Sequence, residues 1–333
     1  MRAMCCENPR PVNQNPLALV EVPAPAPAAH EIRLQIQACG ICHTDLHVVE
    51  GDLPPQKQPV IPGHQIIGVV EAIGEGVQRF KIGNRAGVPW LNRTCGTCVF
   101  CQRGQENLCE NARFTGYHVD GGFAEYIVVH EDFAYAIPEA FDATAAAPLL
   151  CAGVIGYRAL RLSDMQSGQR LGLFGFGASA HLVIQIARYW NCEVFVFSRS
   201  AAHRKMAEAL GATWAGGAEE TAPAKLDSAI IFAPAGWIVH AALRNLQKGG
   251  TVALAGIHMS PIPEMNYGLI YHERTLRSVA NSTRDDVHEL LRLAATIPLR
   301  AEIEIFSLLE ANRALQLLKA GQINGAGVLE IGL

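Results

Sequence analysis

The chain has 333 residues, of which 50% are hydrophobic and 17% are charged. This apolar content excludes a mainly disordered chain, and with about 100 to 200 residues per domain the length predicts two domains. The formal net charge of −4 argues against nucleic acid or an anionic membrane surface as a partner.

No segment of the sequence predicts export or membrane insertion. The longest apolar run, Ala143 to Tyr157, contains Thr144 and Pro148 and is shorter than the roughly 20 residues that span a bilayer. The first residues lack the basic stretch and apolar block of a secretory signal. We therefore expect a cytoplasmic protein without a membrane partner.

The first half of the chain predicts a β-rich, barrel-like domain. Three prolines spaced two apart, Pro23, Pro25 and Pro27, predict a stiff extended connector. Residues 31–38 then alternate polar and apolar side chains, as a half-buried strand does. Short segments punctuated by glycines predict further strands at 66–74, 81–88 and 121–130.

From about Gly153 strands and helices alternate, which predicts a parallel α/β domain. The predicted strands are 170–174, 193–197, 229–233 and 251–255, and the predicted helices are 178–190, 201–210 and 237–246. Beyond about Asn281, two helices (285–296 and 308–320) and a strand (327–331) are expected to return to the first domain. The predicted domains are therefore 1–152 together with 281–333, and 153–280.

Four of the ten cysteines are clustered in one short segment. They are Cys95, Cys98, Cys101 and Cys109, with spacings of three, three and eight residues. Four thiolates on a tight loop can close a tetrahedron around Zn²⁺ and leave no open position, so the cluster predicts a structural zinc. The alternative, two disulfides, belongs to secreted proteins, and no secretory signal is found.

A second group of potential metal ligands is spread along the chain. The motif CGICHTDLH at 39–47 is followed by PGH at 62–64 and, far downstream, by Cys151. Cys39 and Cys42 by themselves also fit a redox CxxC pair, and an isolated histidine is more often a core or surface group than a ligand. The residues alone leave both interpretations open.

Gly175, Gly177 and Ala180 form a GxGxxA turn between a predicted strand and a predicted helix. Glycines there let backbone N–H groups approach a pyrophosphate at the helix N-terminus. The strand before the turn and the helix after it favour a dinucleotide site. The alternative is a glycine-rich turn that only packs two elements together.

The predicted strand 193–197 ends in Ser198 and Arg199, where dinucleotide sites for NAD usually have an acidic residue, and Arg204 follows closely. A serine and an arginine offer hydrogen-bond donors and a positive charge to a 2′-phosphate, which an acid would repel. We therefore predict a preference for NADP(H) over NAD(H). If Arg199 only stacks on adenine, both cofactors bind.

Taken together, these motifs resemble the zinc-containing alcohol dehydrogenases of the medium-chain dehydrogenase/reductase superfamily. The resemblance rests on GICHTDLH at 40–47, PGH at 62–64, the cysteine lobe at about 90–112, LLCAG at 149–153 and the GxGxxA turn. It implies an α/β fold with a GroES-like β-rich catalytic domain and a Rossmann doubly wound coenzyme domain, with the active site in the cleft between them. It also implies a homodimer or homotetramer.

The resemblance further implies two zinc ions per chain and a role for individual residues. The catalytic zinc would be held by Cys42, His64 and Cys151, with Asp45 orienting His64 and a fourth position open for water or substrate. Thr44 would contact the substrate oxygen, and His47 would end a proton relay. Trp90 would narrow the alcohol pocket, with Tyr117 and Ile257 as weaker candidates for its walls. His43 and Arg284 would contact the cofactor pyrophosphate.

Three positions depart from the family pattern. Gln65 follows the zinc histidine where glutamate is usual, which puts carboxylate-assisted ligand exchange in question. Ile155 stands where a threonine is frequent, so the contact behind the nicotinamide differs. Asn84 replaces the aspartate of a Gly-Asp-Arg turn, which we interpret as structural.

The expected activity is hydride transfer between an alcohol, primary or secondary, and NADP(H), or the reverse reduction of an aldehyde or ketone. Zinc would lower the pKa of the alcohol hydroxyl far enough for an alkoxide to exist at neutral pH. The alternatives are an NAD-preferring alcohol dehydrogenase and a quinone or enoyl reductase of the same superfamily, whose members generally lack zinc. A zinc-ribbon interaction module is disfavoured by the net charge and the dinucleotide motif.

Overall fold

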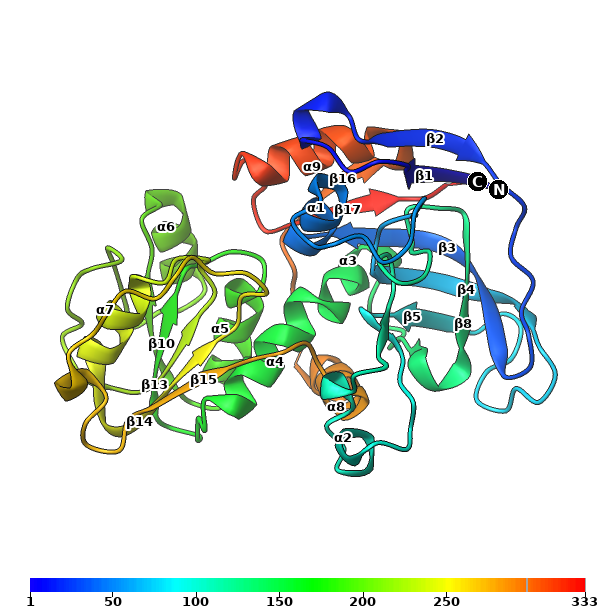
Figure 1. The fold of residues 1–333 in the computed structure, drawn as a ribbon. Coiled ribbons are helices and arrows are strands. Elements are labelled where there is room, and N and C mark those ends of the chain that lie inside the picture. Colours follow the sequence, from blue (N-terminus) through cyan, green and yellow to red (C-terminus); the bar gives the residue numbers. More distant parts are fainter. Residues whose placement is uncertain (298, 333) are drawn as a thin grey trace. The chain divides into compact units, whose positions relative to one another are not determined.

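The computed structural model describes residues 1–297 and 299–332, and the chain divides into two compact units (Figure 1). The first unit comprises Met1–Cys151, Ser282–Ala295 and Ala301–Leu333, and the second comprises Ala152–Asn281 and Thr296–Arg300. The sequence places residues 296–300 in the first domain, whereas the structure groups them with the second unit. The Arg300 backbone N–H and carbonyl both hydrogen-bond to the Gln185 side chain, at 3.0 and 2.9 Å, which ties this segment to the second unit.

A seven-stranded sheet is the centre of the first unit, within the residues that the structure describes. Its strand order is β16-β17-β3-β4-β5-β9, and β8 also pairs with β3. The strands are β3 (Glu31–Ile41), β4 (Gln65–Ile73), β5 (Arg85–Val88), β8 (Tyr126–His130), β9 (Tyr135–Ala136), β16 (Ile303–Ser307) and β17 (Ala326–Glu330). Residues 31–37 of β3 bury every second side chain, whereas its last four residues are all buried. The first half of β3 pairs with β8 and the second half with β17.

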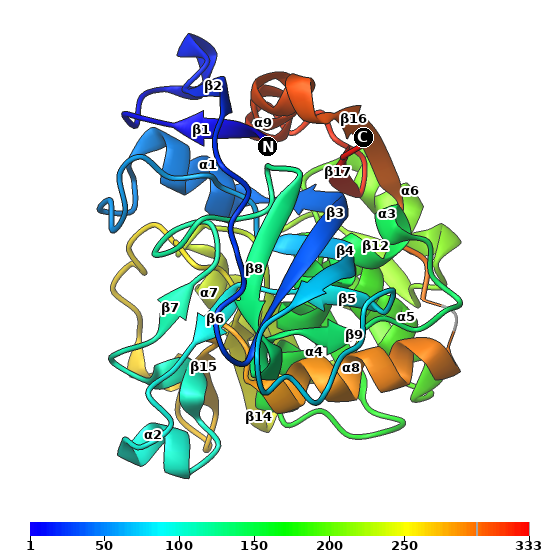
Figure 2. The ribbon, with the colours of Figure 1, turned by 90° about the vertical axis from the view of Figure 1, so that its right-hand side faces the viewer.

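The remaining elements of the first unit surround this sheet. They are the hairpin β1 (Arg2–Cys6) and β2 (Leu17–Glu21), the short pair β6 (Leu91–Arg93) and β7 (Arg113–Phe114), and the helices α1 (His43–Glu50), α2 (Val99–Gln102), α3 (Ala143–Ala146), α8 (Arg284–Thr296) and α9 (Ala311–Lys319). Helix α8 runs along the β5–β9 end of the sheet (Figure 2). The rings of Tyr135, in β9, and His288, in α8, lie 4.9 Å apart there.

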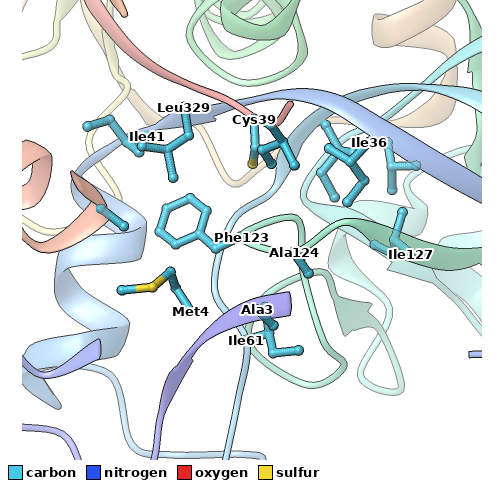
Figure 3. Packing of buried hydrophobic residues seen from close by; sticks show 14 of the residues in the cluster. Ala3, Met4, Ile36, Cys39, Ile41, Ile61, Phe123, Ala124, Ile127 and Leu329 are labelled. Atoms are coloured by element: carbon cyan, nitrogen blue, oxygen red, sulfur yellow. The ribbon is translucent and has the colours of Figure 1, made fainter. Parts of the chain in front are cut away.

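The core of the first unit joins segments that are far apart in the sequence. Phe123, which is fully buried, lies among Met4, Ile41 and Leu329, from the beginning, the middle and the end of the chain (Figure 3). Burying each such side chain is worth about 1.5–3 kcal/mol. The C-terminal strand β17 therefore completes the domain in which the chain begins.

The second unit is a doubly wound α/β domain. Among the described residues, its six parallel strands follow the order β12-β11-β10-β13-β14-β15, the arrangement of a Rossmann dinucleotide-binding fold. The strands are β10 (Arg170–Phe174), β11 (Glu193–Phe197), β12 (Trp214–Gly216), β13 (Leu226–Ile231), β14 (Leu246–Leu254) and β15 (Thr275–Ser278). The helices are α4 (Ala152–Leu162), α5 (Ala180–Tyr189), α6 (Ala201–Ala209) and α7 (Ile238–Asn245).

Two predicted strands are shorter in the structure, for local reasons. The segment 81–88 is a strand only from Arg85, because the Asn84 side chain accepts a hydrogen bond from Lys81 N–H at 2.8 Å and closes a turn. The segment 121–130 is a strand only from Tyr126, because residues 121–123 hydrogen-bond to the backbone of residues 61–63 instead. The turn supports the structural interpretation of Asn84.

One run among the described residues, Ala143–Leu162, has the length and hydropathy to cross a membrane, but 61% of its apolar window is buried within the structure. Mostly buried core helices of soluble proteins share these properties. The run is also divided between α3, the 3₁₀ turn Ala147–Leu150 and α4. These features agree with a core segment.

Candidate active site

The N-terminus of α1 fixes the first potential metal ligand. Cys42 is the N-cap residue, and its sulfur accepts a hydrogen bond from Thr44 N–H at 3.3 Å. Asp45, three residues on, accepts in return from Cys42 N–H at 2.9 Å. This reciprocal arrangement is a capping box, so the local sequence of the CHTD segment orients both the thiol and the carboxylate.

Cys42, His64 and Cys151 converge, and their ligand atoms all lie within 4.8 Å of one another. The Cys42 sulfur is 3.2 Å from His64 Nε2 and 3.9 Å from the Cys151 sulfur. With metal–sulfur bonds of about 2.3 Å, two sulfurs of a tetrahedral zinc site lie about 3.8 Å apart. The two thiols and the imidazole therefore fit a single zinc ion.

Asp45 orients the imidazole of this group. Its Oδ1 lies 2.9 Å from His64 Nδ1 and also accepts from Gly63 N–H at 3.0 Å. Burial raises the pKa of Asp45, and the facing His64 imidazole opposes that rise. A carboxylate at Nδ1 directs Nε2 toward the metal position, so the geometry agrees with the role that the resemblance implies for Asp45.

The sulfur of Cys42 is stabilised as a thiolate. The Cys151 thiol donates a hydrogen bond to it and holds the pKa of Cys42 well below its ordinary value, against the opposing effect of burial, and His64 acts in the same direction. Only the thiolate is a strong metal ligand. The group is therefore prepared for metal binding.

The four clustered cysteines form a second group, at the tip of the β6–β7 pair. The sulfur separations are 3.5 Å for Cys98–Cys101 and for Cys109–Cys95, and 3.9 Å for Cys95–Cys101. Hydrogen bonds from the N–H groups of Thr97 and Cys98 lower the pKa of Cys95 to about 6. All ten cysteines are free thiols in the structure, so it contains no disulfide in this lobe.

Thr44 and His47 follow Cys42 on α1. Thr44 is buried and His47 is partly exposed. His47 Nδ1 lies 2.8 Å from Asp52 Oδ2, just beyond the helix. Asp52 was not among the residues predicted from the sequence, although its position five residues after a candidate relay histidine and directly after Gly51, which ends the helix, was a usable signal.

An aromatic cluster lies against the metal-ligand group. The Trp90 indole meets the His64 imidazole edge to face at 4.8 Å and lies nearly parallel to Phe114 at 5.2 Å and to Tyr117 at 5.8 Å. Trp90 therefore lies beside the metal-ligand group, and Phe114 is an additional residue of this aromatic cluster. Ile257, by contrast, belongs to the second unit and is 55% exposed.

The GxGxxA turn joins β10 to α5 in the second unit. Gly175 has φ +88°, which glycine adopts without strain, and an added Cβ would lie 3.0 Å from Ala233 N. A Cβ on Gly177 would meet nothing within 4 Å, so that backbone is open to an approaching ligand. Ala180 is buried at the first position of α5.

The loop after β11 presents Arg199 to solvent, while Ser198 is buried. The guanidinium of Arg204 donates hydrogen bonds to the carbonyls of Ser198 and Arg199, at 2.7 and 3.2 Å. Arg204 therefore shapes the loop, and Arg199 is the exposed positive charge at the end of β11.

Two further candidates for cofactor contact lie in the first unit. His43 is exposed at the start of α1. Arg284 begins α8, where its guanidinium lies 3.2 Å from a Glu106 carboxylate oxygen and 5.3 Å from the ring centre of Phe133. Gln65, which departs from the family pattern, is buried next to His64 and pairs with Gly40 of β3.

Known proteins share this architecture. Residues 28–139 match the family model of the alcohol dehydrogenase GroES-like domain, and residues 180–296 match that of the zinc-binding dehydrogenase. A probable alcohol dehydrogenase, AdhA, of Mycobacterium tuberculosis is 44% identical over 337 residues, which cover 99% of this chain and 97% of that protein. The chain belongs to the zinc-containing alcohol dehydrogenases.

The family membership extends to the fold. An alcohol dehydrogenase of Geobacillus stearothermophilus is 34% identical over 95% of this chain and 96% of that one. A solved cinnamyl alcohol dehydrogenase from Sorghum bicolor superimposes with a TM-score of 0.91 at 28% identity, covering 99% of this chain and 97% of its own. The predicted combination of a GroES-like and a Rossmann domain is confirmed. As a medium-chain alcohol dehydrogenase, the protein is an oxidoreductase that acts on CH–OH groups with a nicotinamide cofactor.

Proposed function

We propose that this alcohol dehydrogenase is a two-zinc enzyme that prefers NADP(H) and interconverts primary or secondary alcohols with aldehydes or ketones. The observation that carries the proposal is the convergence of Cys42, His64 and Cys151 within 4.8 Å, with Asp45 behind the histidine. Quinone and enoyl reductases of the superfamily generally lack zinc and these ligands. The presence of the three ligands therefore favours alcohol dehydrogenase activity over quinone or enoyl reduction.

The two donor groups differ in the number of ligands. The lobe offers four thiols, which close a tetrahedral shell around a structural zinc. The group at α1 offers three ligands and so leaves one position open, as in catalytic zinc sites. Asp45 supports this assignment because a metal-ligating histidine usually donates its other N–H to a carboxylate.

When bound, zinc supplies a Lewis acid for the substrate oxygen, and the nicotinamide accepts or returns the hydride. The chain's own groups orient the substrate and move the proton. Thr44 is buried two residues after Cys42, where its hydroxyl hydrogen-bonds the alcohol oxygen. His47 takes the released proton, and Asp52, 2.8 Å from its Nδ1, stabilises the imidazolium. The proton then passes to solvent.

The aromatic wall limits the shape of the substrate. Trp90 contacts His64 edge to face, so it lies beside the proposed metal position and narrows the pocket. One methylene in an apolar pocket changes discrimination by about 1–3 kcal/mol, which is enough to select among alcohols of different size.

The preference for NADP(H) is supported by the loop after β11. Arg199 is exposed directly after the buried Ser198, and no acidic side chain stands at this strand end. A guanidinium binds a phosphate through charge-assisted hydrogen bonds. Arg204 stabilises this loop by donating hydrogen bonds to the carbonyls of Ser198 and Arg199.

Steady-state kinetics test the proposal. The purified enzyme is assayed on short, medium and aromatic alcohols and the matching aldehydes, each with NADP(H) and NAD(H). We expect turnover with several alcohols and a higher kcat/KM with NADP(H). Activity on quinones or enoyl compounds but on no alcohol would overturn the reaction, and an equal kcat/KM with both cofactors would overturn the cofactor preference.

A further inference from the structure

Tyr117 contacts two separate parts of the candidate site through different portions of one side chain. Its hydroxyl donates a hydrogen bond to the Pro54 carbonyl at 2.7 Å. Its ring lies nearly parallel to the Trp90 indole, at 5.8 Å and 17°. The first contact reaches the loop after α1, and the second reaches the aromatic wall.

The loop that Tyr117 holds is the one that carries Asp52. It leaves α1 at Gly51, whose N–H donates to the His47 carbonyl at 3.1 Å, and Leu53 N–H approaches the same carbonyl at 3.4 Å. Asp52 is 60% exposed and its partner His47 is 18% exposed. An exposed carboxylate has little packing to hold it, so its position depends on where the loop is attached.

We propose that Tyr117 is a positioning residue that couples the pocket wall to the proton relay, an inference that rests on the function proposed above. Its hydroxyl fixes the loop at Pro54 and so keeps Asp52 on His47. Its ring supports Trp90, which contacts His64. The two effects are separable because Tyr117→Phe removes the hydroxyl and keeps the ring, whereas Phe114→Leu alters the stack on Trp90, together with the Phe114–His118 ring contact, and leaves the Tyr117 hydroxyl in place.

Among the charged groups around α1, Asp52 is the carboxylate whose position depends on the loop. Lys319 of α9 is paired with Glu50 at 2.6 Å, and Arg10 is bonded to the Asn15 carbonyl. Further along the same loop, Lys57 is paired with Asp120 at 2.8 Å. On α1 itself, Asp45 faces His64 and Cys42 N–H, and His43 is exposed. None of these pairs involves Tyr117 or Pro54.

The test compares three variants by the pH profile of kcat/KM for alcohol oxidation. In Asp52→Asn the imidazolium loses its carboxylate, so we expect a fall of about three- to five-fold near neutral pH and an acid limb displaced to lower pH. Tyr117→Phe is expected to lower kcat/KM near neutral pH and to displace the acid limb to lower pH, as Asp52→Asn does. Phe114→Leu is expected to leave the acid limb in place and to change the ratio of kcat/KM between a bulky and a small alcohol.

A double-mutant cycle decides whether Tyr117 acts through Asp52. If it does, Tyr117→Phe with Asp52→Asn is no slower than Asp52→Asn alone, whereas independent effects would multiply. Multiplied effects, or a Tyr117→Phe profile identical to that of the wild type, would overturn the proposal. In Tyr117→Phe, a change in the bulky-to-small ratio without a change in the acid limb would also overturn it.

Control variants keep the outcome interpretable. Tyr126→Phe removes a tyrosine hydroxyl on β8, where the ring lies beneath Arg33, and should leave both the profile and the ratio unchanged. Zinc content and the thermal midpoint are measured for every variant to exclude misfolding. If the wild type oxidises no alcohol, the proposed function fails first, whereas an active wild type with an unaltered Tyr117→Phe variant refutes only the coupling.

Discussion

The sulfurs of Cys42 and Cys151 lie 3.9 Å apart although 109 residues separate them in the chain. Cys42 caps α1, and Cys151 follows the 3₁₀ turn Ala147–Leu150. Neither segment alone carries a metal site. Packing of the turn against β3 and β4 brings the second thiol to the first.

Metal content follows from the two donor groups. We expect the wild type to bind two zinc ions per chain and Cys151→Ala to bind one, with alcohol turnover lost, because two ligands hold zinc far more weakly than three. Atomic absorption on the purified protein measures the zinc. Cys39→Ala is the matched control, since Cys39 is buried beside this group but outside it; zinc loss in that variant, or a single zinc in the wild type, would contradict the assignment.

Cofactor preference depends on Arg199. In Arg199→Asp we expect NADPH affinity to fall by about 10- to 100-fold, because a charge-assisted hydrogen bond contributes about 1.5–3 kcal/mol and the new carboxylate repels the 2′-phosphate. NADH affinity should be little changed. Fluorescence titration with each cofactor measures both affinities. Arg244→Asp changes an exposed arginine of α7 and serves as control; unaltered NADPH binding in Arg199→Asp would refute the phosphate contact.

Proton transfer depends on His47. A positioned base contributes about 10²–10⁴-fold, and a terminal relay group that solvent partly replaces contributes at the low end. We therefore expect His47→Gln to lower alcohol oxidation by about 10- to 100-fold near neutral pH, with partial recovery at alkaline pH. The pH dependence of kcat/KM measures this effect. An acid limb that matches the wild type would remove His47 from the relay.

Acid sensitivity of the first unit is expected from Glu131, which is 5% exposed. Burial alone would raise the pKa of this carboxyl, but the N–H groups of Arg79 and Gln78 stabilise the charged form and hold the pKa below its usual 4.5. A folded-state pKa below the unfolded one stabilises the protein fully above the unfolded value, and this stability is lost as the pH falls through the folded value.

The variant Glu131→Gln should therefore lower the free energy of unfolding by about 1–3 kcal/mol at pH 7, since two backbone N–H groups lose a charged acceptor. The difference from the wild type should shrink as the pH falls below about 4. Urea unfolding at both pH values measures this, with the exposed Glu7→Gln as control. A difference that does not depend on pH would show that the carboxylate charge is not involved.

Association into a homodimer is expected from the second unit. Its edge strand β15 pairs on one side only, with β14, in the described sheet. The segment just before β15 exposes Ile262, Tyr267 and Tyr271, by 38%, 69% and 54%. An open edge and exposed apolar side chains favour a second copy as partner. Light scattering should give a dimer or a larger oligomer, and Tyr267→Asp should reduce the mass; a monomeric wild type at micromolar concentration would contradict this.

Local signals in the sequence were sufficient for much of the fold. The strands 170–174 and 193–197 are predicted to the residue, because apolar runs between turn residues define them. The helix expected from 178 begins at Ala180, after the glycine turn. The predicted strand 81–88 is too long, because one hydrogen bond from Lys81 N–H to the Asn84 side chain overrides the strand preference of the segment.

The candidate site likewise has parts that the sequence predicted and parts that it did not. The sequence by itself indicated the family, the four-cysteine cluster and the GxGxxA turn, because the motifs that carry them are short local patterns. The resemblance to the family already indicated that Cys151 joins Cys42, but only the tertiary structure showed that Tyr117 meets Pro54 and that Gln185 meets Arg300. These contacts depend on side-chain packing and loop paths between segments 63 to 115 residues apart, which no local pattern encodes.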